Sequence, residues 1–295
     1  MPPRIQRFGG PHTQLKEEVV LRYLEAYLVA LSAQPFNLTY IDAFAGSGWR
    51  RSTGSPGGAG TRGCALKVLA MPRRFHRYSF GDLKPQNVAS LNQEVEQQRE
   101  AWSAAGLALP QQPEVSVACA DANDLVADEC ARLRANRMAR AVAFLDPFGM
   151  QVKWETLRRI KETGKVDLWL LLPIHIGLVR MLPRHGRMHE AWKRRLDEFL
   201  GYTGWREQAY PETTTVDLFG ERTVTQRVEA DQLTNIVMAR LRELFGTGLL
   251  NRALDLHIGG RRSYTLVFAC TSPVSGAVRV AHNIAGHIIG KSQAT

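Results

Sequence analysis

Three runs of strand-forming residues in the first half of the chain each end in an aspartate. These runs are Leu38–Asp42, His76–Asp82 and Glu114–Asp121, and a segment of helical spacing follows each. Strands that alternate with helices form a parallel sheet with right-handed crossovers, so their carboxyl ends lie at one edge, where ligands bind. We therefore expect the three aspartates to meet a ligand, although capping of a following helix would account for one of them.

A glycine-containing turn follows the first of these strands. It reads Phe44-Ala-Gly46-Ser-Gly48, and its two glycines allow the backbone to approach a ligand closely. Many strand-to-helix turns contain such a pair, so the turn alone is a weak signal. Combined with the acidic strand ends it predicts a nucleotide site, in which Asp82 accepts hydrogen bonds from the two hydroxyls of a ribose.

The remaining strands define the type of sheet. Ala141–Asp146 and Val166–Pro173 continue the parallel pattern, and the second of them is apolar enough to be buried on both faces. Leu254–Ile258 and Tyr264–Cys270 are joined by a short glycine turn, which predicts an antiparallel hairpin. We therefore expect an α/β fold with a Rossmann-like doubly wound sheet, mostly parallel and closed by a C-terminal antiparallel hairpin, as in class I S-adenosylmethionine-dependent methyltransferases.

The expected organisation is one domain with an insertion. Residues 1–14 are polar and rich in Pro and Gly, which predicts a loosely ordered arm before a domain covering 15–295. Leu15–Ala33 has the spacing of an amphipathic helix that packs on the sheet. The glycine-rich segment 49–63 is expected to lack regular structure and to be a lid, a phosphate contact or a surface insertion. Residues 176–228 break the alternating pattern and form the insertion, with a hairpin in 213–228.

The charge of the chain favours an anionic partner. Its 38 Lys and Arg residues against 28 Asp and Glu residues give a net charge of +10, which indicates nucleic acid, although a general preference for arginine would have the same effect. The insertion interleaves aromatic residues with cations, so it can stack on bases and neutralise phosphates, or form a solvated helix with a buried aromatic stripe. The nucleic-acid-binding cations predicted here are Arg180, Arg184, Arg187, Lys193, Arg194 and Arg195.

Two other features restrict the class of protein. The four cysteines, Cys64, Cys119, Cys130 and Cys270, lack the paired C-x2-C spacing of zinc and iron–sulfur sites, so no metal site is assigned to them. The first residues contain no apolar signal region, and no stretch approaches the roughly 18 apolar residues of a membrane span. We expect a cytoplasmic protein without a membrane partner.

Five segments resemble one known family, the three-Cys-motif partner proteins, which have a methyltransferase-like Rossmann fold. The segments are Tyr40–Gly48, Gly81–Asp82, Ala120–Asp121, Phe144–Gly149 and Tyr264–Phe268. The resemblance implies S-adenosylmethionine as the cofactor and a three-cysteine-motif protein as a partner. It also implies a role for each cofactor contact: Asp42, Phe44, Gly46 and Gly48 at the methionine end, Asp82 at the ribose, and Asp121 with Ala122 at the adenine.

The catalytic group implied by the resemblance is Asp146-Pro147-Phe148. The segment is similar to the Asp-Pro-Pro-Tyr motif of amino methyltransferases and to the Asp-Pro-Phe-Gly of tRNA guanine-N2 dimethyltransferases. In such sites the carboxylate and a backbone carbonyl accept from an exocyclic amine and hold its lone pair towards the methyl group. Phe148 stands one position before the stacking tyrosine of the first group. The alternative for Asp146 is a bond to the amides of its own loop.

Three functions remain open at this point. The first is an S-adenosylmethionine-dependent methyltransferase acting on an amino group of a nucleic-acid base, RNA before DNA. The second is a non-catalytic module of the same fold that binds a three-cysteine-motif protein or nucleic acid. The third is a nuclease in which Asp42, Asp121 and Asp146 bind Mg²⁺.

Overall fold

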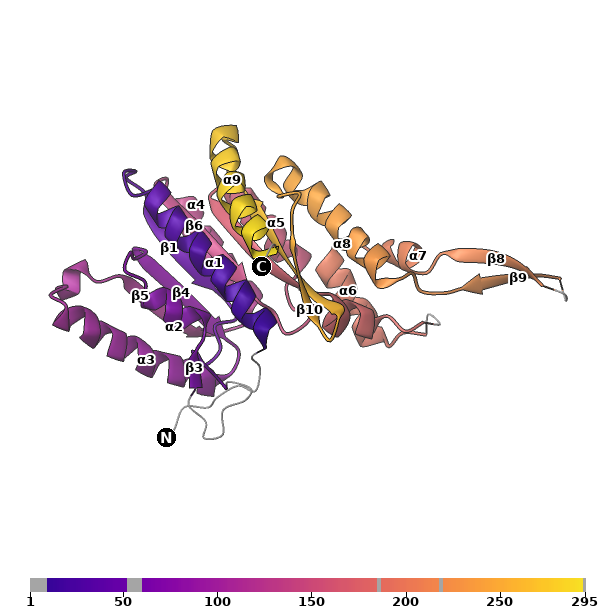
Figure 1. Ribbon diagram of the computed structural model, residues 1–295, viewed down its shortest axis with the longest axis horizontal. Coiled ribbons are helices and arrows are strands. Elements are labelled where there is room, and N and C mark those ends of the chain that lie inside the picture. The colour runs from indigo at the N-terminus through magenta and orange to yellow at the C-terminus, as the bar shows by residue number, and fades with distance from the viewer. Residues whose placement is uncertain (1–9, 52–59, 185–186, 218–219, 294–295) are drawn as a thin grey trace.

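A single seven-stranded sheet organises the protein. The computed structural model describes residues 10–51, 60–184, 187–217 and 220–293. Within these ranges the strand order of the sheet is β10-β11-β7-β6-β1-β4-β5 (Figure 1). The strands are β1 (Asn37–Asp42), β4 (Arg77–Asp82), β5 (Glu114–Cys119), β6 (Ala139–Leu145), β7 (Val166–Pro173), β10 (Leu254–Ile258) and β11 (Arg261–Cys270).

The pairing of the strands confirms the expected fold class. β5, β4, β1, β6 and β7 are parallel, whereas β11 pairs antiparallel with both β7 and β10. A mostly parallel sheet closed in this way by a C-terminal hairpin is the Rossmann-like fold of class I methyltransferases. The chain reverses its direction of travel across the sheet between β1 and β6, and such a switch point opens a crevice at the carboxyl ends of the strands.

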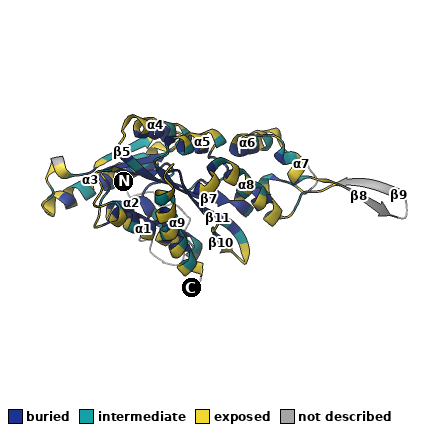
Figure 2. Ribbon diagram, turned by 90° about the horizontal axis from the view of Figure 1, so that it is seen from above, coloured by how far each residue is buried: buried dark blue, intermediate teal, exposed yellow. Residues whose placement is uncertain are grey.

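Helices cover both faces of the sheet (Figure 2). The core on one face receives side chains from α1 (Pro11–Ala30), α2 (Cys64–Leu69), α3 (Pro85–Ala104) and α9 (Ser275–Gln293). The core on the other face receives them from α4 (Ala122–Ala135), α5 (Trp154–Thr163) and α8 (Ala230–Phe245). Every residue of β7 is buried, as its apolar run predicts. None of the helices in the described ranges is long and apolar enough to span a membrane.

Two segments differ from the sequence-based expectation. α1 begins at Pro11, so residues 11–14 belong to a helix and not to an arm; proline suits a first helical turn, where its missing N–H needs no partner. Residues 1–9 lie outside the described part. In the glycine-rich segment, β2 (Trp49–Arg51) pairs antiparallel with β3 (Gly60–Arg62), although no regular structure was expected there. Residues 52–59, which connect these strands, also lie outside the described part.

The insertion forms an extension on one side of the body. It starts with one π-helical segment, η2 (Ile174–Val179), and continues through α6 (Glu190–Leu200) and α7 (Trp205–Ala209). β8 (Glu212–Asp217) and β9 (Gly220–Thr225) then form a separate two-stranded sheet that projects from the body (Figure 1). The hairpin expected in residues 213–228 is therefore present.

Candidate active site

A cavity of about 600 Å³ lies where β1, β6 and β7 end. Its walls come from α1, from the glycine turn after β1, from the loop after β6, from η2 and from the β10–β11 hairpin. Eight of the residues predicted from the sequence line it, namely Asp42, Phe44, Gly46, Gly48, Asp146, Pro147, Phe148 and Arg180. The cavity therefore combines the expected methionine end of a cofactor site with the expected acceptor group.

The glycine turn has a backbone that only glycine adopts readily. Gly46 and Gly48 have φ angles of 65° and 81°, both in the left-handed region. A Cβ atom on Gly48 would also come within 3.0 Å of the Leu66 side chain. The turn is held against the neighbouring strand by a 2.9 Å hydrogen bond from the Ala45 N–H to the Gly81 carbonyl. Both glycines are therefore required by backbone shape and, at Gly48, by space.

The three aspartates at the ends of β1, β4 and β5 share one local hydrogen-bond pattern. In each, Oδ1 accepts from the backbone N–H two residues later: Phe44 to Asp42 at 3.1 Å, Lys84 to Asp82 at 2.8 Å, and Asn123 to Asp121 at 2.8 Å. Asp121 thereby caps the N-terminus of α4, as the sequence predicts. Local turn formation therefore accounts for one carboxylate oxygen in each of the three aspartates. The sequence had suggested such a local role for only one of them.

Asp42 lies in a buried and electrostatically unusual position. Only 2% of the residue is exposed. Burial raises the pKa of its carboxyl group to about 8, although the hydrogen bond from the Phe44 N–H lowers this pKa. The negative charge of Asp146 raises the pKa further, and the Lys16 ammonium lowers it. Asp42 is therefore largely protonated near neutral pH until a cation approaches it.

Two charged residues of α1 enter the cavity. The Lys16 ammonium forms a hydrogen-bonded ion pair with Oδ2 of Asp146. Its neighbour Glu17 is 3% exposed and binds both the Arg50 guanidinium and the Lys67 ammonium, the latter at 2.8 Å. Neither Lys16 nor Glu17 was predicted from the sequence to belong to the site. The sequence did contain a sign that they point inward, because both lie on the inward-facing side of an amphipathic helix, one turn before its buried apolar residues.

The residues expected at the ribose and adenine lie further along the same edge of the sheet. Asp82, Asp121 and Ala122 do not line the cavity: Asp82 ends β4, and Asp121 and Ala122 come just after β5, the two strands beyond β1. Asp82 also accepts a 2.9 Å hydrogen bond from the Asn87 side chain, again at Oδ1. The next residue, Leu83, is 65% exposed and was not singled out from the sequence.

The predicted nucleic-acid-binding cations do not form one continuous surface. Arg180 lines the main cavity, whereas Arg194 and Arg195 line a second hollow formed largely by α6. Lys193 is bonded to Glu190 at 2.6 Å, so its charge is already matched. Arg184 and Arg187 are exposed on either side of residues 185–186, which lie outside the described part.

The aromatic residues of the insertion divide in the same way. Phe199 and Trp205 are 3% and 1% exposed and belong to the core below α6 and α7, so they cannot stack on bases. Trp192 is 41% exposed. Phe199 and Trp205 therefore belong to a buried aromatic stripe, whereas Trp192 is exposed enough to stack on a base.

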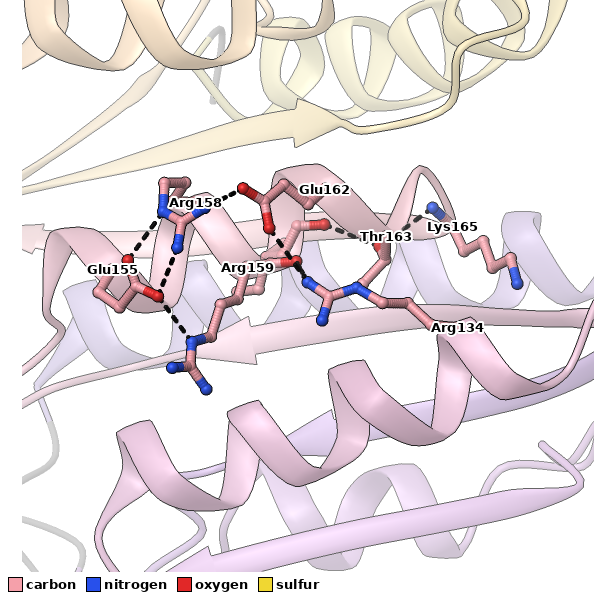
Figure 3. Close-up of polar contacts among 8 residues, drawn as sticks. Arg134, Glu155, Arg158, Arg159, Glu162, Thr163 and Lys165 are labelled. Carbon is pink, nitrogen blue, oxygen red and sulfur yellow. Dashed lines mark hydrogen bonds and ion pairs between the residues drawn. The ribbon is translucent and has the colours of Figure 1, made fainter.

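Many other cations are neutralised by neighbours, as on α5 (Figure 3). Glu155 accepts bonds from Arg158 at 2.7 Å and from Arg159 at 2.8 Å, and these bonds lower the pKa of its carboxyl group to about 2. Glu162 binds Arg158 as well as Arg134 of α4. The net charge of +10 is therefore not spread evenly over the surface that nucleic acid can reach.

No group of three or more His, Cys, Asp or Glu side chains is arranged to hold a metal ion in the part of the chain that the structure describes. The nuclease hypothesis needs Asp42, Asp121 and Asp146 to converge on one ion. Asp42 and Asp146 line the cavity and Asp121 does not. This arrangement gives the nuclease hypothesis no support.

Comparison with known proteins adds little beyond the fold. No model of a protein family matches the chain, and neither does any curated protein. Among solved structures, LPL1258 from Legionella pneumophila is 12% identical, with a TM-score of 0.49 over 96% of this chain and 94% of that one. Trm1 from Pyrococcus horikoshii in complex with S-adenosyl-L-methionine is 12% identical, with a TM-score of 0.39 over 95% and 73%.

A third structure, the magnesium protoporphyrin IX methyltransferase ChlM from Synechocystis with bound S-adenosylmethionine, is 15% identical, with a TM-score of 0.27 over 74% of this chain and 79% of that one. These likenesses are too distant to assign a family or an activity to the chain. The strand order of the sheet, with its antiparallel β11, identifies the chain as a class I methyltransferase-like Rossmann fold.

Proposed function

We propose that the protein transfers the methyl group of S-adenosylmethionine to an amino group of a nucleic-acid base, RNA before DNA. One observation supports this above all others: a single cavity is lined both by the glycine turn after β1 and by Asp146-Pro147-Phe148 after β6. A cofactor on the first group and an acceptor amine on the second would share this space.

The residues of the cavity suit the methionine end of the cofactor. The left-handed Gly46 and Gly48 give a close backbone approach, and Asp42 is a carboxyl group beside the turn that can bind an ammonium group. Two donors on the same wall, Trp49 Nε1 and Arg50 Nε, are buried and have no hydrogen-bond partner in the described structure. An unsatisfied buried donor is costly, so rotation of either side chain towards a ligand carboxylate in the cavity would be favoured.

The edge beyond the cavity suits the nucleoside end. Within the described residues the Lys84 N–H and the Asn87 side chain both donate to Oδ1 of Asp82, so Oδ2 is available to a ribose hydroxyl. The exposed Leu83 offers an apolar platform next to it, on which an adenine ring can lie. Asp121 and Ala122 remain the proposed adenine contacts, with Asp121 Oδ1 held by the Asn123 side chain at 2.8 Å as well as by its backbone.

The mouth of the cavity suits a flat, partly apolar acceptor. Phe148, Ile176 and Ile258 line it from three different elements and are 61%, 42% and 40% exposed. Exposed apolar side chains around a cavity that also holds charged groups indicate a ligand site. Phe148 itself belongs to the predicted acceptor group, one position before the stacking tyrosine of the similar motif.

In this proposal S-adenosylmethionine supplies an electrophilic methyl group, and the chain positions the nucleophile. Lys16 holds Oδ2 of Asp146, so Oδ1 is the oxygen that accepts an N–H of the acceptor amine. The bond orients the lone pair of the amine, and Asp146 or water removes the proton released after transfer. Lys16 is thus a positioning residue, fixed on the inner face of α1.

The Lys16–Asp146 pair also favours the second candidate function. An ammonium already bonded to the carboxylate uses part of the capacity that an acceptor amine would need. In that case the same fold would bind a three-cysteine-motif protein or nucleic acid without passing on a methyl group. The two functions differ in whether labelled methyl groups ever leave the cofactor.

Isothermal titration with S-adenosylmethionine tests the cofactor site. Wild-type protein is expected to bind one equivalent, and Asp42→Ala to bind at least tenfold more weakly because an ionic contact to the ligand is removed. Absence of heat with the wild type, or equal affinity in Asp42→Ala, would contradict the proposal. Arg158→Ala, on the surface of α5, is the matched control and is expected to bind like the wild type.

A further inference from the structure

A second hollow lies on α6. It has a volume of about 630 Å³ and is lined by Met181, Ala191, Trp192, Arg194, Arg195 and Glu198. Arg180 lines the main cavity, and Met181, the next residue in the chain, lines this hollow, so one short segment contributes to both sites. A chain-like ligand that passes along this segment can reach both.

One face of α6 forms most of the hollow. Ala191, Arg194, Arg195 and Glu198 follow the spacing of a single helical stripe, and all four are exposed. The opposite face of α6 is anchored in the core through Leu196, Phe199 and Leu200. The stripe is therefore presented to solvent by a helix whose orientation is fixed.

The stripe carries positive charge that no neighbour neutralises. Neither Arg194 nor Arg195 forms an ion pair with any other residue of the described structure, in contrast to Lys193 and to the arginines of α5. Glu198 is the one opposing charge on the wall, which leaves the hollow net positive. Free guanidinium groups at this spacing suit the phosphates of a polynucleotide.

The hollow also offers a stacking surface. The Trp192 indole is 41% exposed, and its other neighbour is the His189 ring, at 6.5 Å between ring centroids. Met181 adds a second apolar wall. A base can stack on an indole only if its face is not already covered by neighbouring bases, which is the case in a single strand and not in a duplex.

We infer that this hollow binds an unpaired nucleotide next to the acceptor base, with the base on Trp192 and its phosphates on Arg194 and Arg195. The substrate is then a single-stranded or looped segment of nucleic acid that runs past Arg180 from one site into the other. This inference rests on the proposed function, because it takes the main cavity as the site of the acceptor base.

Fluorescence anisotropy with a labelled 12-nucleotide single-stranded RNA tests the inference. Trp192→Ala is expected to bind about tenfold more weakly, and Trp192→Phe to retain most of the affinity, because stacking on an aromatic ring is the interaction removed. For Arg194→Ala/Arg195→Ala, the slope of log affinity against log salt is expected to fall by about 1.4, since each phosphate contact on a single strand contributes about 0.7. Melting temperatures near that of the wild type show that the variants are folded.

Arg158→Ala/Arg159→Ala is the matched control, because it removes two exposed arginines whose charges Glu155 already neutralises. It is expected to leave both affinity and salt slope unchanged, and a 12-base-pair duplex is expected to bind more weakly than the single strand. Wild-type affinity in Trp192→Ala, or equal binding of duplex and single strand, would overturn the inference. S-adenosylmethionine titrations of the same variants should match the wild type. A wild type that does not bind S-adenosylmethionine would count against the proposed function, whereas a wild type that binds S-adenosylmethionine but not the single-stranded RNA would count against this hollow.

Discussion

The ammonium group of Lys16 and the carboxylate of Asp146 are bonded across the cavity, although 130 residues separate them in the chain. The side chains are 11% and 27% exposed, so water competes only partly for either charge. The pair joins α1 to the loop after β6 and leaves one carboxylate oxygen for an acceptor. It thereby ties the position of Asp146, the proposed acceptor-binding group, to α1.

Replacing Lys16 by methionine removes this ionic contact while keeping a long side chain. Methyl transfer is expected to fall about tenfold, because an unanchored Asp146 holds the acceptor less well, whereas cofactor affinity should change less than threefold. Lys16→Arg should retain more activity, since it can still bind the carboxylate. Single-turnover transfer and titration of the cofactor separate the two effects, and faster transfer in Lys16→Met would show that the ammonium competes with the acceptor.

Alanine at Gly48 should disrupt the glycine turn. A left-handed alanine costs about 1 kcal/mol, and here its Cβ would also press on Leu66, so both the free energy of unfolding and the affinity for S-adenosylmethionine should fall. Gly106→Ala is a matched control, because Gly106 has a similar φ of 84° with no atom within 4 Å of a Cβ. That variant should lose stability alone; equal loss of affinity in both would contradict a role for the turn in binding.

Asp42 should make stability depend on pH. Its pKa is about 8 in the folded protein and near 3.8 when unfolded, so between these values only the folded state keeps the proton. The free energy of unfolding should therefore fall as pH rises through this window, by about 1.4 kcal/mol per pH unit at most. Asp42→Asn removes this contribution, so its stability relative to wild type should increase from pH 5 to pH 8. Urea unfolding at several pH values measures this, and parallel curves would show that Asp42 does not titrate there.

Leu83→Ala should weaken cofactor binding without destabilising the fold. The side chain is 65% exposed, so little packing is lost, but an adenine ring would lose its apolar contact and the affinity should fall about fivefold. Leu109→Ala provides the comparison, because Leu109 is 72% exposed. If both variants bind S-adenosylmethionine like the wild type, the adenine does not lie on Leu83.

The sheet could be predicted from sequence because its strands are long apolar or alternating runs separated by clear turns. β7 has the predicted boundaries, and the Gly259-Gly260 turn marks the hairpin that distinguishes this sheet from an all-parallel one. The starts of helices were predicted less accurately: α1, for example, begins at Pro11 and not at Leu15. The β2–β3 hairpin was missed because glycine content argues against strands locally, whereas in the structure Arg50 is held by Glu17 from a distant helix.

The candidate site could be predicted only in part from the sequence, for a related reason. Acidic strand ends marked Asp42, Asp82 and Asp121, yet each has a local hydrogen bond that a turn needs in any protein. What the pattern could not supply was the set of partners brought by the fold, such as Lys16 beside Asp146. Likewise, the interleaved aromatics of the insertion gave no sign that Trp205 faces the core and Trp192 the solvent.

The most direct test of the account is transfer of a labelled methyl group from S-adenosylmethionine to RNA by the wild type and by Asp146→Asn, with cofactor binding measured on both. We predict that the wild type labels an amino group of a base in unpaired RNA. Asp146→Asn should bind the cofactor within about threefold of wild type and transfer at least a hundredfold more slowly, because only the group that orients the acceptor has changed. Wild-type protein that binds S-adenosylmethionine but labels neither RNA nor DNA would contradict the account and leave the fold with a binding role.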